Sequence, residues 1–158
     1  MLNEQERNQL LEHVRSYPEP RAGLTYVLQY LQQRAGYLSD AAVTEAAKLT
    51  GLSEMQVNEI ITFYTLLYRR PTGRHIVRLC DSLVCSARGS ESLFAHAERV
   101  LGVPTGTNTP DGAITVLPSI CLGLCDHAPA VLVDETAAGP LDKASLAAIL
   151  ENLQKNEE

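Results

Sequence analysis

Apolar residues recur every three to four positions through the first 70 residues, which is the spacing of amphipathic helices. This pattern predicts four helices, over residues 3–16, 22–34, 40–49 and 54–68. Ser39 suits the N-cap of the third helix, and Ser53 with Gln56 forms the capping-box pattern that opens the fourth. Pro71 and Gly73 end this region, so we expect a helical bundle over residues 1–72.

The pattern changes after Arg74, where apolar residues gather in short runs. These runs predict strands at residues 75–80, 113–117 and 130–134, with helices at 90–101 and 141–153. Residues 109–112 read Thr-Pro-Asp-Gly, a turn signal before the second strand. The order β-α-β-β-α is typical of a small α/β layer. The whole chain is therefore expected to be α+β, with residues 1–72 and 73–158 as separate domains.

Composition places the chain among ordinary globular proteins. Its 158 residues are 45% apolar, but no run of 18 apolar residues is present, so no direct membrane insertion is expected. Charges at Glu4, Glu6, Arg7 and Glu12 stand where a secretory signal would need an apolar segment. We therefore expect a cytoplasmic protein in a reducing compartment.

The distribution of charge argues against a nucleic-acid partner. The net charge is −6, with seven Lys/Arg against eight Asp/Glu in residues 1–72 and six against eleven in residues 73–158. Residues 39–67 resemble a helix-turn-helix, but their second helix offers Glu54, Asn58 and Glu59 and has no Lys or Arg before Arg69. Nucleic-acid surfaces need clustered cations to neutralise phosphates, so DNA binding is excluded.

All four cysteines lie in the acidic half and form two pairs. Cys80 and Cys85 are separated by four residues, and Cys121 and Cys125 by three. Each pair follows a predicted strand, in a loop that contains small residues such as Ser82 or Gly123. In a reducing compartment such pairs bind metal or carry out redox chemistry more often than they form structural bridges.

The spacing alone leaves three interpretations open. A [2Fe–2S] cluster uses four thiolates, and small residues let backbone N–H groups approach the sulfurs. Structural zinc uses the same ligands, although its pairs usually have two or four intervening residues. The third interpretation is four cysteines without a metal, either reduced or in two local disulfides. The spacing does not match plant-type ferredoxins, and only His127 lies close enough for a Rieske-type centre.

The residues around the cysteines favour the cluster. The stretches Gly73–Cys85 and Leu117–Pro129 closely resemble the two ligand loops of the 24-kDa-type (E-type) subunit family of bacterial NADH:quinone oxidoreductase, respiratory complex I. The helical half is similar as well, through Pro20-Arg21, Gly36-Tyr37 and Ile61–Tyr64. The similarity runs from about residue 15 to residue 150 without a large gap.

This resemblance implies a helical N-terminal domain followed by a thioredoxin-like α/β ferredoxin domain. It implies one [2Fe–2S] cluster on Cys80, Cys85, Cys121 and Cys125. It also implies a partner subunit that binds FMN and NADH, and further subunits of a peripheral arm on the cytoplasmic side of the inner membrane. The chain would then act within an NADH dehydrogenase (quinone) complex. It contains no G-x-G-x-x-G after a strand, so we assign it neither a nucleotide nor a flavin site.

Other members of the redox class remain as alternatives. The equivalent diaphorase subunit of an NAD-linked hydrogenase or a formate dehydrogenase shares this cysteine pattern, and a zinc-stabilised interaction module is a more distant alternative. Asp81 and Asp126 stand next to predicted ligands, so added negative charge would be disfavoured and a low reduction potential is expected. Pro129 is a candidate for a cis peptide bond. Residues 135–138 stand where the family that the chain resembles more commonly has a tight glycine turn. The sequence therefore does not decide whether a hairpin forms after Asp134.

Overall fold

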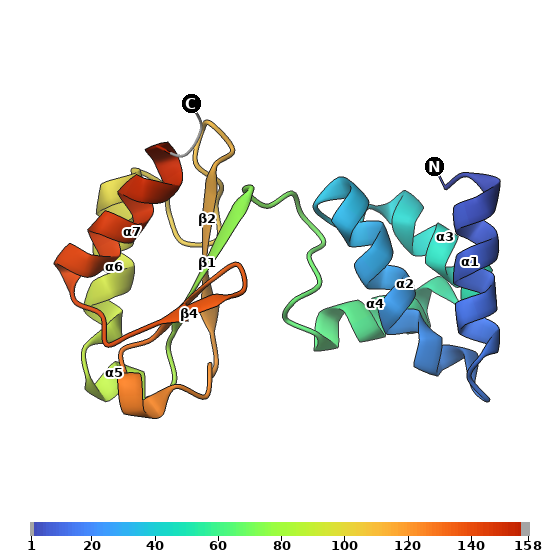
Figure 1. The fold of residues 1–158 in the computed structure, drawn as a ribbon, viewed down its shortest axis with the longest axis horizontal. Coiled ribbons are helices and arrows are strands. Elements are labelled where there is room, and N and C mark those ends of the chain that lie inside the picture. The colour runs from blue at the N-terminus through green and yellow to red at the C-terminus, as the bar shows by residue number, and fades with distance from the viewer. Residues whose placement is uncertain (1, 156–158) are drawn as a thin grey trace. The chain divides into compact units, whose positions relative to one another are not determined.

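The computed structural model describes residues 2–155. They divide between Pro71 and Thr72 into two compact units. The first unit is helical and the second combines helices with a sheet (Figure 1). No helix within residues 2–155 is both long enough and apolar enough to cross a bilayer.

The first unit consists of four helices, as the apolar spacing predicts. They are α1 (Glu4–Arg15), α2 (Pro20–Ala35), α3 (Asp40–Thr50) and α4 (Glu54–Phe63). Their apolar faces meet in one core, in which Leu24, Leu28 and Val57 are fully buried. The predicted caps are present, because Ser39 accepts from the backbone N–H of Ala42 and Ser53 from that of Gln56.

Two helix ends in this unit differ from the predicted ones by two residues or more. Helix α2 begins at Pro20, because proline fits the first helical turn, where its missing N–H is not needed. Helix α4 ends at Phe63, five residues before the predicted end. The reason is a long-range contact: the Gln32 side chain donates to the Leu66 carbonyl and accepts from the Tyr68 N–H, which holds this segment out of the helix.

The second unit is built on a four-stranded sheet. Its strands are β1 (His75–Cys80), β2 (Ile114–Ser119), β3 (Val131–Val133) and β4 (Thr136–Ala138), in the spatial order β2-β1-β3-β4. Strand β1 is parallel to β2 and antiparallel to β3. Helices α6 (Ser90–Leu101) and α7 (Lys143–Lys155) cover one face of this sheet (Figure 1).

Several short elements of the second unit were not predicted. A five-residue helix, α5 (Leu83–Ala87), occupies the supposed loop after β1, and a 3₁₀ turn, η1 (Cys125–His127), follows the third cysteine. Strand β2 continues through Pro118, which is tolerated because β2 is an edge strand, bridged on its outer side by Asn108 at Thr115, three residues before the proline.

The hairpin left open by the sequence does form. Strands β3 and β4 are antiparallel, with Val133 opposite Thr136. Asp134 takes the left-handed conformation usual for glycine, with φ 51°. Its carboxylate accepts from the Ile76 N–H at 2.8 Å and contacts His75 Nδ1 at 2.8 Å. These contacts stabilise the turn without a glycine.

Candidate metal centre

The first cysteine pair is buried at the end of β1. Cys80 is the last residue of this strand, and Cys85 lies in the middle of α5, so the unpredicted helix turns Cys85 back towards the sheet. Both side chains are almost fully buried and belong to a small cluster with Ala128 and Ala130. The Cys80 N–H donates to the Ala130 carbonyl at 3.0 Å, which ties this strand end to the segment after the second pair.

The second pair lies on the loop between β2 and β3. Cys121 follows the end of β2 and Cys125 begins η1, and both side chains are exposed. Gly123 lies between them with φ 74°, and its N–H donates to Cys121 Sγ at 3.4 Å. The expected approach of a backbone amide to a sulfur is therefore present at Cys121, and a backbone hydrogen bond from Ala130 also acts on Cys85, where it lowers the pKa.

The electrostatics of Cys85 show which thiols are close to one another. Burial raises the pKa of Cys85, a hydrogen bond with the Cys80 thiol raises it further, and the charge of Cys125 acts in the same direction. Cys80 and Cys85 lie in the same buried cluster, and Cys125 is close enough for its charge to act on Cys85. Cys121 is not among the causes of this shift in the pKa of Cys85. Within residues 2–155, no three His, Cys, Asp or Glu side chains are close enough together to coordinate one metal ion.

The donor set nevertheless fits an iron–sulfur cluster. All four cysteines are free thiols, so the two-disulfide interpretation is not what the structure has. Sulfur ligands of this kind suit zinc or iron–sulfur clusters. Cys80 and Cys85 already lie together in one buried cluster, and the charge of Cys125, on the loop after β2, acts on Cys85. The assignment of all four as ligands stays a prediction.

The charged residues beside the cysteines are solvent-exposed. The Asp126 carboxylate contacts His127 Nδ1 at 2.9 Å, and this contact is the main reason that the pKa of Asp126 lies below its ordinary value. Asp81 is exposed next to Cys80. Ala128–Pro129 is a cis peptide bond, which confirms the candidate from the sequence, and Gly139–Pro140 is a second one.

One charged residue near the cysteines was missed in the sequence. Arg78 lies on the central strand β1, two residues before Cys80, and only 9% of it is exposed. Burial lowers its pKa, and Asp134 acts in the opposite direction. The sequence did contain a signal for it, because a charged residue inside the apolar run of residues 75–80 is unusual for a buried strand.

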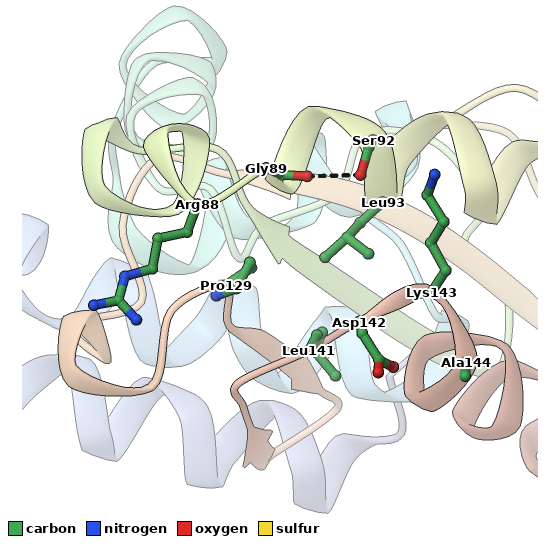
Figure 2. A pocket seen from close by; sticks show the side chains of 9 residues that line it. All are labelled: Arg88, Gly89, Ser92, Leu93, Pro129, Leu141, Asp142, Lys143 and Ala144. Carbon is green, nitrogen blue, oxygen red and sulfur yellow. Dashed lines mark hydrogen bonds between the residues drawn. The ribbon is translucent and has the colours of Figure 1, made fainter.

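A surface pocket in the same unit contains none of the cysteines. It lies between the start of α6, the cis Pro129 and the start of α7. Figure 2 shows Arg88 and Lys143 at opposite ends of this pocket, with Leu93 and Leu141 between them. The Asp142 side chain accepts from the Ser145 N–H and so caps α7. We assign no site to this pocket.

Comparison with known proteins agrees with the resemblance that the two cysteine loops carry. Residues 10–154 match the thioredoxin-like [2Fe-2S] ferredoxin family. The E-type subunit of the NADH-quinone oxidoreductase of Pseudomonas aeruginosa is 36% identical over 151 residues, which cover 96% of this chain and 91% of that protein. The protein of the same name from Escherichia coli (strain K12) is 34% identical over 150 residues, covering 95% and 90%. An E-type subunit of Rhizobium meliloti, numbered 2, is 39% identical over 141 residues, covering 89% and 84%.

A solved structure is similar too. A chain of an NAD+-reducing [NiFe]-hydrogenase in the air-oxidised state matches with a TM-score of 0.70 and 26% identity, over 84% of this chain and 23% of that longer one. Together these matches confirm the resemblance drawn from the two cysteine loops and the predicted fold class.

Proposed function

The chain belongs to the thioredoxin-like [2Fe-2S] ferredoxin family, and from this premise we propose that it is an electron-transfer subunit of an NADH-quinone oxidoreductase complex. Cys80, Cys85, Cys121 and Cys125 hold its one [2Fe–2S] cluster. The observation that carries this proposal is the burial of Cys80 and Cys85 in one cluster, with Cys125 close enough for its charge to act on Cys85.

The two cysteine pairs have different roles in this site. Such a cluster, when bound, gains and loses one electron at a time. Cys80 and Cys85 sit on a strand end and a helix, so they supply the fixed and water-excluding side of the site. Cys121 and Cys125 are on an exposed loop and supply the outer side, where electrons enter and leave. The Gly123 N–H bonded to Cys121 Sγ stabilises negative charge on that sulfur.

The proposed partner is the subunit of the same complex that binds FMN and NADH, with further subunits of a peripheral arm on the cytoplasmic side of the inner membrane. Support comes from the curated relatives, which are named as subunits of NADH-quinone oxidoreductases and match at 34–39% identity over most of this chain. We also propose that residues 1–72 and 73–158 are two domains. Their separate hydrophobic cores support this division.

The second candidate function is the equivalent subunit of an NAD-linked hydrogenase. It is favoured by the similarity to the NAD+-reducing [NiFe]-hydrogenase at a TM-score of 0.70. That match has 26% identity and covers 23% of the other chain, whereas the NADH-quinone oxidoreductase relatives match over nearly their whole length at higher identity. Purification of the native complex through a tag on this chain separates the two: NADH-quinone reductase activity supports the first, and NAD+-reducing hydrogenase activity supports the second.

The cluster itself is tested on the full chain purified without oxygen. We expect about two irons per chain and no zinc, with an EPR-silent oxidised state and a rhombic S = 1/2 signal after dithionite. Cys125→Ala should abolish the iron and the signal, whereas Ser119→Ala, a small change at the end of β2, should keep both. One zinc per chain without iron would instead support a zinc-stabilised interaction module and would refute electron transfer.

A further inference from the structure

Arg78 is a positive charge buried in the strand that ends at Cys80. It lies on β1, the inner strand between β2 and β3, and is 9% exposed. Lys and Arg side chains are rarely buried to this extent, because removing the charge from water is costly. A buried arginine on a strand that leads into the candidate metal centre therefore calls for a physical role.

The strand geometry relates Arg78 to Cys80 directly. Side chains alternate between the two faces of a strand, so residues two apart lie on the same face. Val77 and Leu79 belong to the core beneath α6 and α7, which places Arg78 with Cys80 on the other face. Their Cα atoms are separated by about 7 Å, the rise of two residues in a strand.

The cross-strand neighbours of Arg78 are apolar. Its neighbours across the sheet are Leu117 on β2 and Leu132 on β3, both apolar and half-buried. Charges act more strongly in such surroundings than in water, and salt screens them less. A guanidinium also stays protonated in proteins, so this charge is permanent.

We propose that Arg78 sets the reduction potential of the cluster by raising it, a role that rests on the proposed function. One electron passes from the donor to the cluster; the donor is oxidised, no bond is broken, and the formal charge of the four-thiolate site goes from −2 to −3. Arg78 stabilises the more negative state more than the less negative one. Reduction is therefore easier than it would be with a neutral residue at this position.

Other charges near the site act less strongly. Asp134 opposes Arg78, but its side chain is 43% exposed, and its N–H bonds to the Ile76 carbonyl, four residues before Cys80. Asp81 and Asp126 disfavour reduction from the loops, where both are exposed to screening by water and salt. The buried positive charge of Arg78 thus opposes the effect of these acidic residues, from which the sequence alone predicts a low reduction potential.

The test is an EPR-monitored redox titration of the full chain and of variants with matched iron content. For Arg78→Gln we expect the equilibrium constant for reduction to fall about tenfold, which moves the midpoint potential by about 59 mV to more negative values for a one-electron couple. Arg78→Lys keeps the charge and should stay close to the original potential. Arg88→Gln is the control, because Arg88 is exposed three residues after Cys85. The smaller shift in midpoint potential of this variant should vanish at high salt, whereas the shift of Arg78→Gln should persist.

The outcomes separate this inference from the proposed function. A cluster with an unchanged potential in Arg78→Gln overturns the inference and leaves the function standing. Equal shifts of the midpoint potential in Arg78→Gln and Arg78→Lys also overturn it, because the effect would then come from the shape of the side chain and not from its charge. If Arg78→Gln fails to retain iron, Arg78→Met, which keeps an apolar stem of similar length, takes its place under the same criteria. An original chain without iron refutes the proposed function itself.

Discussion

Gly139 is the residue at which the backbone around the candidate metal centre leaves the least space. A Cβ atom there would lie 2.2 Å from the His127 carbonyl oxygen and 3.1 Å from that of Pro129. Both are backbone atoms, so they cannot turn aside as a flexible side chain would. We predict that Gly139→Ala lowers the free energy of unfolding by about 1–3 kcal/mol, measured by chemical denaturation. Because His127 ends the turn that begins at Cys125, the iron content should fall as well.

The control for this substitution is Ala137→Ser, which adds one atom at an exposed position two residues earlier. Surface changes of this kind stay within roughly 0.5 kcal/mol. If Gly139→Ala were as stable as Ala137→Ser and kept its iron, the close contact with His127 would not restrict this position.

Single residues differed in how far the sequence revealed them. The cysteine pairs and the cis Pro129 were found because flanking residues carry a local pattern. The burial of Cys85 was not, because it depends on a five-residue helix too short to show periodicity. The contact of Gly139 with His127 joins residues twelve apart in the chain, so no local signal predicts it.

Among the elements, α1 depends on an acidic residue at its start. The Glu6 carboxylate accepts from the Asn3 N–H at 2.8 Å and pairs with Arg34 on α2. The Asn3 N–H is the larger cause and Arg34 the second in lowering the pKa of Glu6 below its ordinary value. A carboxylate with a lowered pKa stabilises the fold above the pKa of the unfolded chain, and this stabilisation is lost as the pH falls through the lowered value.

We therefore predict that Glu6→Gln is less stable than the original chain at neutral pH and that this difference disappears on acidification. Gln keeps the capping geometry, so the variant isolates the charge. The measurement is the free energy of unfolding as a function of pH. Glu4→Gln removes a charge from the same helical turn without the contacts to Asn3 and Arg34. An equal pH dependence in both variants would contradict a specific role for Glu6.

Element types followed from periodicity, whereas element ends depended on contacts between distant residues. Helix α6 matched its predicted range because Gly89 and Gly102 limit it locally. Helix α4 ended early because Gln32, on another helix, binds the segment that follows. Strand β4 was missed because its three residues, Thr136–Ala138, acquire strand structure only by pairing with β3.

For the whole molecule, the change of apolar spacing near Gly73 indicated two regions, and the structure contains two separate hydrophobic cores besides the small cluster at the cysteines. The strand order could not be obtained in the same way. Strand β1 pairs with β2, which begins 34 residues after β1 ends, and with β3, which lies further along the chain. Such pairings are settled by packing between distant segments, and a single sequence carries no direct record of them.

The separate cores lead to the last prediction, which concerns how the two units unfold. Leu28 is fully buried in the helical core and Leu146 in the core beneath the sheet. Truncating either to alanine leaves a cavity and should cost about 2–5 kcal/mol. If each unit is stabilised by its own core, calorimetry of the full chain should resolve two transitions. Leu28→Ala should lower the temperature of one and leave the EPR signal of the cluster unchanged, whereas Leu146→Ala should lower the other and weaken cluster retention. One transition, shifted equally by both substitutions, would mean that the units unfold together and that residues 1–72 contribute directly to the stability of the metal centre.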